Sequence, residues 1–181
     1  MVTDKFKALV HLAVASCDDP QRLGATRLNK ICWYSDTIAY RSHGQPITTE
    51  TYVRRQHGSA PRNALVVLKQ LEDEGKIKVR HSDHPIYKTR LFINLEDADT
   101  SLFAPYEIEI IQGVAKAICE NYTASSISEF SHDCIWEAAN EGEIIPLFAT
   151  LAGQAGEITD EIMTWADSVV ERVCEAQPVT P

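Results

Sequence analysis

The spacing of apolar residues is the feature that most constrains the fold of this chain. It follows a helical period over several long stretches, and apolar and polar residues alternate in only one stretch. In residues 4–17, 25–43 and 61–74, apolar positions recur every three or four residues. Residues 76–95 instead alternate apolar and polar side chains on both sides of a turn-rich stretch at 81–85, which predicts a β-hairpin. The pattern therefore predicts a mainly α fold with a small embedded β-hairpin, an α+β chain.

Glycine and proline mark the expected boundaries of these elements. Gly44 and Pro46 fit the end of the second helix, and Pro61 fits the first turn of the third. Between them we expect a short helical turn from Thr48, an extended run at 52–55 and a turn at 57–61. Further helices are expected at 105–120, 126–140, 144–152 and 157–176.

Together these elements predict one compact helical domain over residues 1–177. Its motif-bearing core spans about 8–145, acidic helices fill about 144–176, and 178–181 form a tail.

The middle of the chain has the order of elements typical of a winged helix-turn-helix. The helix at 61–74 ends near Gly75 and is followed by a hairpin rich in basic residues. The candidate contacts to nucleic acid or to a protein partner are Arg54, Arg55, Arg62, Asn63, Lys69, Lys78, Arg80, Lys88 and Arg90. A solvated basic surface explains the same residues without a function.

Charge is distributed unevenly along the chain. The net charge of −9 combines about −1 for residues 1–20, +7 for 21–90 and −15 for 91–181. Such asymmetry affects partner choice and encounter rate more than it affects the fold. The acidic part would repel a phosphate backbone and attract a basic protein, so the charge favours a protein partner over DNA.

The five cysteines and the absence of a long apolar run indicate a cytoplasmic, non-membrane protein. The odd number of cysteines and their wide spacing argue against a disulfide framework and a Cys-x-x-Cys zinc site. We expect reduced, mostly buried thiols. The first helix carries Asp4, Lys5 and Lys7 at helical spacing, which is unlike a signal peptide.

Two ordered sets of residues resemble the Panacea domain family of SocA-like antitoxins. The first runs from the helix Leu28–Asp36 to a glycine-containing turn, and the second lies near Trp136. The motif residues are Leu28, Lys30, Tyr34, Asp36, Tyr40, Gly44, Pro46, Thr48, Tyr52, His57, Gly58, Ser128, His132 and Trp136. The turn at Gly58–Pro61 differs from the family pattern, because its proline is displaced.

The resemblance implies an antitoxin that neutralises a cognate toxin protein by direct binding, with no cofactor and no catalytic residues. At least one relative is a proteolytic adaptor, so a cellular protease is a second expected partner. The alternative is a winged-helix DNA-binding regulator, and regulation of its own gene would combine this role with that of an antitoxin. Neither the toxin's class nor the oligomeric state follows from the resemblance.

Two polar clusters suggest chemistry but fit structural roles better. Ser131, His132 and Asp133 are consecutive, and on one helix their side chains would point in different directions, so we expect no catalytic triad. His81 and His84 flank Asp83 at an exposed hairpin tip without a further ligand nearby, so we expect no metal site.

Lys30, Tyr34 and Asp36 are the polar residues of the motif helix. They either tie this helix to the segment 52–61 or form a patch that contacts the toxin. We favour the scaffold role, because one signature that serves many unrelated toxins is easier to explain as structure.

Overall fold

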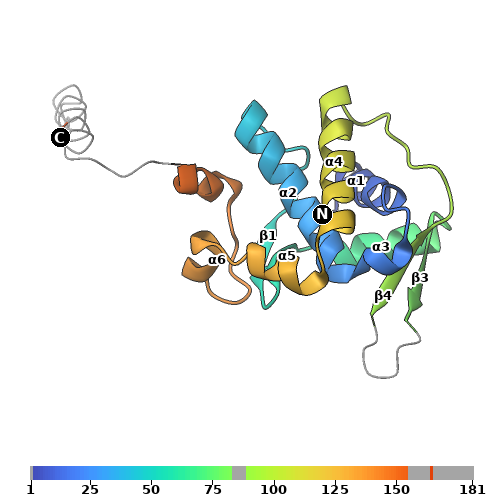
Figure 1. Ribbon diagram of the computed structural model, residues 1–181. Coiled ribbons are helices and arrows are strands. Elements are labelled where there is room, and N and C mark those ends of the chain that lie inside the picture. The colour runs from blue at the N-terminus through green and yellow to red at the C-terminus, as the bar shows by residue number, and fades with distance from the viewer. Residues whose placement is uncertain (1, 83–88, 155–163, 165–181) are drawn as a thin grey trace, which may run out of the picture.

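The computed structural model describes residues 2–82, 89–154 and 164. At its centre lie three helices, α1 (Asp4–Ala15), α2 (Gly24–His43) and α4 (Pro105–Asn121), whose buried faces share one apolar core. A 3₁₀ turn, η1 (Pro20–Arg22), links α1 to α2. Figure 1 shows both β-hairpins at the same end of this helical group. The mainly α prediction with a small β part is confirmed.

Helix α2 is the longest described helix, and its end follows from its sequence. Gly44 has a φ of +75°, a left-handed conformation that glycine adopts without a steric penalty. The Gly44 N–H donates to the Tyr40 carbonyl and closes the last turn. Residues 48–50 form no helical turn, so that expectation is wrong.

The segment after α2 forms a hairpin, not the expected strand followed by a turn. Strand β1 (Tyr52–Arg55) pairs antiparallel with β2 (Gly58–Pro61), and residues 56 and 57 make the turn between them. Pro61 therefore lies in a strand, where its missing N–H is tolerated at an edge. The third helix, α3 (Ala64–Asp73), begins after it.

The free edge of β1 is covered by a distant segment. The Gly142 N–H donates to the Arg54 carbonyl, and the Arg54 N–H donates to the Glu143 carbonyl. The Ile145 N–H then donates to the Tyr52 carbonyl, and Val53 forms a bridge with Ile144. Residues 142–145 thus extend the hairpin and protect its edge.

The expected basic hairpin is present after α3. Strand β3 (Ile77–His81) pairs antiparallel with β4 (Arg90–Asn94), and Val79 lies opposite Phe92. The described pairing includes His81 opposite Arg90, and the Ser82 N–H donates to the Thr89 carbonyl at 2.8 Å. The candidate contact Lys88, together with Asp83 and His84, lies outside the described residues.

Helix formation is interrupted where one helix was expected at 126–140. Helix α5 (Ala124–Phe130) ends before His132, and α6 (Cys134–Ala138) begins after Asp133, whose carboxylate caps it. The apolar period misses this break because capping by Thr123 and Asp133 favours two separate starts.

The chain beyond α6 also differs from the expected helix at 144–152. It forms a 3₁₀ helix, η2 (Leu147–Gln154). The expected helix at 157–176 and the tail lie outside the described residues apart from position 164, so the single domain over 1–177 stays a prediction.

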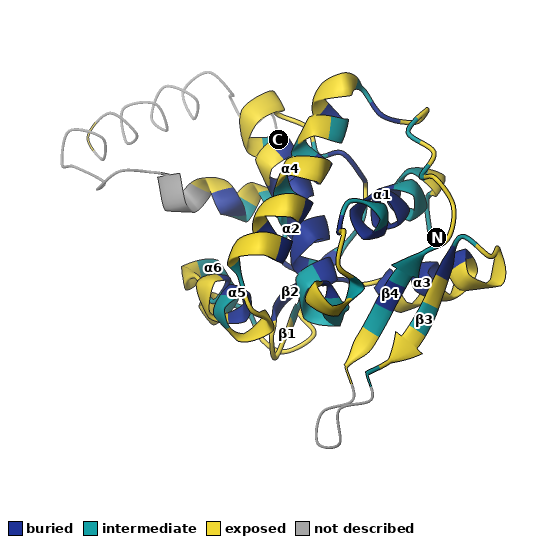
Figure 2. Ribbon diagram, turned by 45° about the vertical axis from the view of Figure 1, so that its right-hand side comes forward, coloured by how far each residue is buried: buried dark blue, intermediate teal, exposed yellow. Residues whose placement is uncertain are grey.

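Burial follows the helix periods. Figure 2 shows the buried faces of α1, α2 and α4 turned toward one another. The core includes Phe6, Leu9, Ile31, Trp33 and Ile111, each at most 3% exposed. No helix within the described part of the chain is long and apolar enough to span a bilayer.

Candidate functional site

A buried carboxylate on α2 organises the residues of the family motif. Asp36 is 0% exposed and lies beside the segment that enters the first hairpin. The Thr48 backbone N–H donates to Oδ1 at 2.7 Å, and the Thr48 hydroxyl donates to Oδ2 at 2.6 Å. The Tyr52 hydroxyl also donates to Oδ2, at 2.7 Å, with the Cys32 carbonyl oxygen at 2.9 Å. Asp36 therefore fixes α2 against both Thr48 and β1.

The hydrogen bonds compensate for the cost of burying this acid. Burial raises the pKa of Asp36 because it disfavours the charged form, while the bonds from Thr48 and Tyr52 oppose that rise. Burial also raises the pKa of Tyr52 well above its ordinary value, and the nearby Asp36 charge adds to the effect. Tyr52 is therefore a neutral phenol that donates to Asp36. This arrangement gives Tyr52 no role as a general base.

Lys30, six residues before Asp36 on the same helix, is buried beneath the other strand of the hairpin. It is 1% exposed, and its Nζ donates to the Ser59 carbonyl at 3.1 Å. Gly58 lies directly over this ammonium group with a φ of +95°. A Cβ at Gly58 would collide with Lys30 Nζ and with the Ser131 hydroxyl. The glycine is needed both for its backbone conformation and for this close approach.

The environment of Lys30 disfavours its charge. Burial lowers the pKa of Lys30 to about 7, although the negative charge of Asp133 acts in the opposite direction. Perturbed lysines occur at active sites, but structural ones occur as well. Within the described residues, its Nζ donates to a backbone carbonyl, which indicates a structural tie.

A stack of side chains joins the hairpin to α6. The Arg54 guanidinium lies 4.0 Å from the centre of the Trp136 ring, and its Nε donates to the Trp136 carbonyl at 3.0 Å. The Trp136 indole N–H donates to the Arg55 carbonyl at 3.0 Å. His132 stacks on the same ring at 3.8 Å between centroids. Trp136, from the second set of motif residues, therefore contacts the β1–β2 hairpin, which Lys30 and Asp36 of the first set hold against α2.

The other motif residues divide between core and surface. Leu28, Thr48 and Ser128 are buried, Tyr34, Tyr40 and Pro46 are half-buried, and His57 is exposed at the hairpin turn. Ser128 Oγ lies 3.5 Å from His132 Nε2. Most of these motif residues are thus at least partly buried, and their role as scaffold stays a prediction.

The consecutive Ser131, His132 and Asp133 do not form a catalytic arrangement, but the reason differs from the expected one. They lie in the break between α5 and α6, not on one helix. The Ser131 hydroxyl donates to the Ser128 carbonyl at 2.7 Å, and Asp133 Oδ1 accepts from the Trp136 N–H at 2.9 Å. Each group has a local structural partner. The described residues also contain no cluster of three or more potential metal ligands.

Several of the candidate basic contacts have local partners. Arg54 is held by Trp136, Arg55 lies 3.8 Å from Glu141, and Lys69 pairs with Asp73. The Asn63 side-chain amide donates to Glu50.

On the second hairpin, alternation separates the remaining basic residues. Lys78 and Arg80 share one face of β3, while Arg90 lies opposite His81 and therefore on the other face. These three residues and Arg62 are exposed.

Residues 28–137 match the family model described as "Antitoxin SocA-like, Panacea domain". The chain belongs to this family. The match covers both sets of motif residues, from Leu28 to Trp136, and lies within the expected span of 8–145. No curated protein and no solved structure gives a significant match.

Sequence reasoning missed two features of this Panacea protein. Glu107 is buried, accepts from Lys5 Nζ at 2.8 Å and caps α4 through the Ala104 N–H at 2.8 Å. Its position three residues after Ala104, at a helix start marked by Pro105, was a usable signal. The pairing of residues 142–145 with β1 had no local signal, because it joins segments about ninety residues apart.

Replacing Tyr52 by Phe should destabilise the fold by about 1–3 kcal/mol, because Asp36 stays buried and loses one of its donors. Urea unfolding measures the change in the free energy of unfolding. Tyr106→Phe is the matched control, since Tyr106 is 37% exposed, and it should change stability by less than about 0.5 kcal/mol. Equal effects of the two substitutions would contradict the role of the Asp36 cluster.

Lys30 should make stability depend on pH in the alkaline range. Its folded pKa of about 7 lies below the ordinary value of 10.5, so the unfolded chain binds more protons between these values. The cost of burying the charge is complete below pH 7 and is relieved as the pH rises toward 10.5.

The difference in unfolding free energy between wild type and Lys30→Met isolates this effect. Wild type should gain stability relative to the variant between pH 7 and pH 9, by a few kcal/mol at most. Urea titrations at several pH values measure it. A constant difference over this range would show that Lys30 stays charged in the folded protein.

Proposed function

We propose that this protein is an antitoxin that neutralises a cognate toxin by direct contact, without a cofactor, a metal or catalysis, in the cytoplasm. Membership of the antitoxin-like family carries the proposal. The geometry of the motif residues supports it, because their hydrogen bonds are satisfied within the protein and leave no group arranged for chemistry.

The buried signature cannot itself contact a toxin. Lys30, Asp36, Thr48 and Tyr52 are each at most 2% exposed, so a partner would reach them only if the hairpin opened. Toxin recognition therefore requires exposed residues that the scaffold holds in place.

An apolar depression between α2, α4 and α5 is the surface best suited to this task. Phe130 is 64% exposed and Ile38 is 41% exposed at its edges. The Phe130 ring lies 6.2 Å from that of Tyr34 and 5.9 Å from that of Tyr122. The lining residues are Tyr34, Ile38, Val114, Ala117, Ile118, Tyr122, Ile127 and Phe130. Contiguous exposed apolar surface with aromatic residues is typical of protein contacts.

Charge near this depression specifies the kind of toxin surface it fits. Glu129 on α5 is exposed and adjoins Phe130 in the chain, whereas Glu120 and Lys116 on α4 line a different pocket beside Cys119. Lys116 is the only basic residue in these two helices. The complementary toxin surface is therefore an apolar segment flanked by lysine or arginine.

Substituting Phe130 by Glu should abolish neutralisation and weaken toxin binding at least about ten-fold, because it places a charge in the apolar contact. The toxin is sought as the product of the neighbouring reading frame. Growth rescue on co-expression and the Kd of the purified pair are measured. Leu65→Glu on α3, where Leu65 is 63% exposed, is the control and should leave both unchanged.

The outcomes distinguish an error in the proposed toxin-binding surface from an error in the proposed antitoxin role. Rescue by wild type that persists with a folded Phe130→Glu variant would reject this surface and keep the antitoxin role. A neighbouring product that is harmless alone, or toxic despite the wild-type protein, would reject the antitoxin role. Loss of toxin only in cells that contain an active protease would indicate delivery to that protease instead of masking.

DNA binding is a second candidate function, favoured by exposed Lys78 and Arg80 on the hairpin that follows α3. A gel shift on the upstream DNA should then be strong at low salt and weaken as salt rises. Lys78→Ala and Arg80→Ala together should reduce it, while Lys69→Ala should not, since Lys69 pairs with Asp73. No shift at low salt would reject this function.

A further inference from the structure

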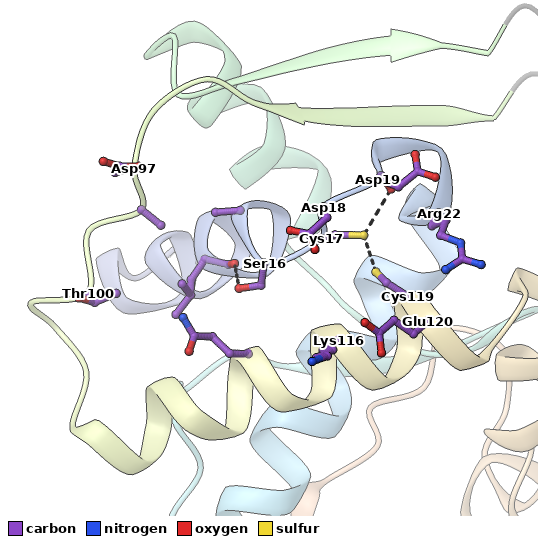
Figure 3. A pocket seen from close by; sticks show the side chains of 14 residues that line it. Ser16, Cys17, Asp18, Asp19, Arg22, Asp97, Thr100, Lys116, Cys119 and Glu120 are labelled. Atoms are coloured by element: carbon purple, nitrogen blue, oxygen red, sulfur yellow. Dashed lines mark hydrogen bonds between the residues drawn. The ribbon is translucent and has the colours of Figure 1, made fainter.

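Two cysteines from distant parts of the chain meet beside a solvent-accessible pocket. Cys17 follows α1 and Cys119 lies in the last turns of α4, 102 residues further on. Their Sγ atoms are 2.6 Å apart, and Figure 3 shows them directed toward one another. A disulfide bond is about 2.05 Å long, so only a small approach separates the thiol pair from a bond.

The pocket gives a small oxidant access to these sulfurs. It has a volume of about 570 Å³ and is lined by Cys17, Cys119, Asp18, Arg22 and Lys116, among others. Figure 3 shows both sulfurs at the wall of this pocket. Cys17 and Cys119 are 8% and 6% exposed, which admits a small molecule more readily than a bulky one.

The surroundings distinguish the two thiols. The hydrogen bond with Cys119 lowers the pKa of Cys17, and the positive charge of Arg27 acts in the same direction, against the effect of burial. The same bond, together with burial, raises the pKa of Cys119. Cys17 is therefore the thiol that loses its proton first and reacts as the nucleophile.

We propose that Cys17 and Cys119 form an oxidative modification site that closes to an intramolecular disulfide in the presence of hydrogen peroxide. The Cys17 thiolate attacks one peroxide oxygen, the O–O bond breaks, and a sulfenic acid and water form. The Cys119 sulfur then attacks Cys17 Sγ, the S–O bond breaks, and a second water leaves. The two thiols together lose two electrons and two protons, and peroxide is reduced to water.

The disulfide would bind the chain segment after α1 to α4 across the core. Closing a loop of this length restricts the unfolded chain strongly. The oxidised protein should therefore resist unfolding better than the reduced one. This site does not depend on the proposed antitoxin function.

The test uses the full chain with Cys134→Ser and Cys174→Ser, because Cys134 is exposed and Cys174 lies outside the described residues. The reduced protein is treated with hydrogen peroxide, and free thiols are counted with a maleimide reagent. Peptide mass spectrometry should then find the Cys17–Cys119 cross-link in a monomer. Its melting temperature should rise on the order of 10 °C and return after reduction with dithiothreitol.

Two variants complete the test. Adding Cys119→Ser should leave a sulfenic acid at Cys17 that a reagent can trap, and peroxide should then no longer raise the melting temperature. Adding Cys32→Ala instead should preserve both the cross-link and the rise in melting temperature. If a variant fails to fold, the cross-link in the parent protein decides. Reduced Cys17 and Cys119 after saturating peroxide, or a cross-link to Cys32 instead, would overturn the proposal.

Discussion

The structure depends on the buried Asp36 carboxylate and its donors from Thr48 and Tyr52. A carboxylate removed from water is costly unless its oxygens accept hydrogen bonds. The observed path of residues 46–52 brings both donors to it. This requirement fixes where β1 begins and how the first hairpin lies against α2.

The remaining contacts build outward from that hairpin. Lys30 supports β2 from below through Ser59, and Gly58 supplies the space that the ammonium group needs. Arg54 on β1 then stacks on Trp136, while residues 142–145 cover the free edge of β1. The two distant halves of the family signature are thus parts of one assembly around the hairpin.

Under the proposed antitoxin function, this arrangement would separate scaffold residues from those that contact the toxin. Buried signature residues such as Asp36 and Lys30 have their hydrogen-bond partners inside the protein. Exposed residues such as Ile38 and Phe130 have few such constraints. Most of the described basic residues are held in separate local contacts, as Lys69 is by Asp73, or lie on opposite faces of the second hairpin.

The sequence alone determined the helices of α1, α2 and α4, the second hairpin and the family, because these depend on local periodicity and on an ordered motif. It also predicted a scaffold role for Lys30 and Asp36. It missed β2, the break between α5 and α6 and the strand-like segment 142–145. Pro61 fitted the first turn of a helix locally, but pairing with β1 places it in a strand. The apolar period fitted one helix over 126–140, but capping by Asp133 starts a separate helix there. Only the tertiary structure brought Cys17 to Cys119, since contacts across a hundred residues leave no periodic trace in the sequence.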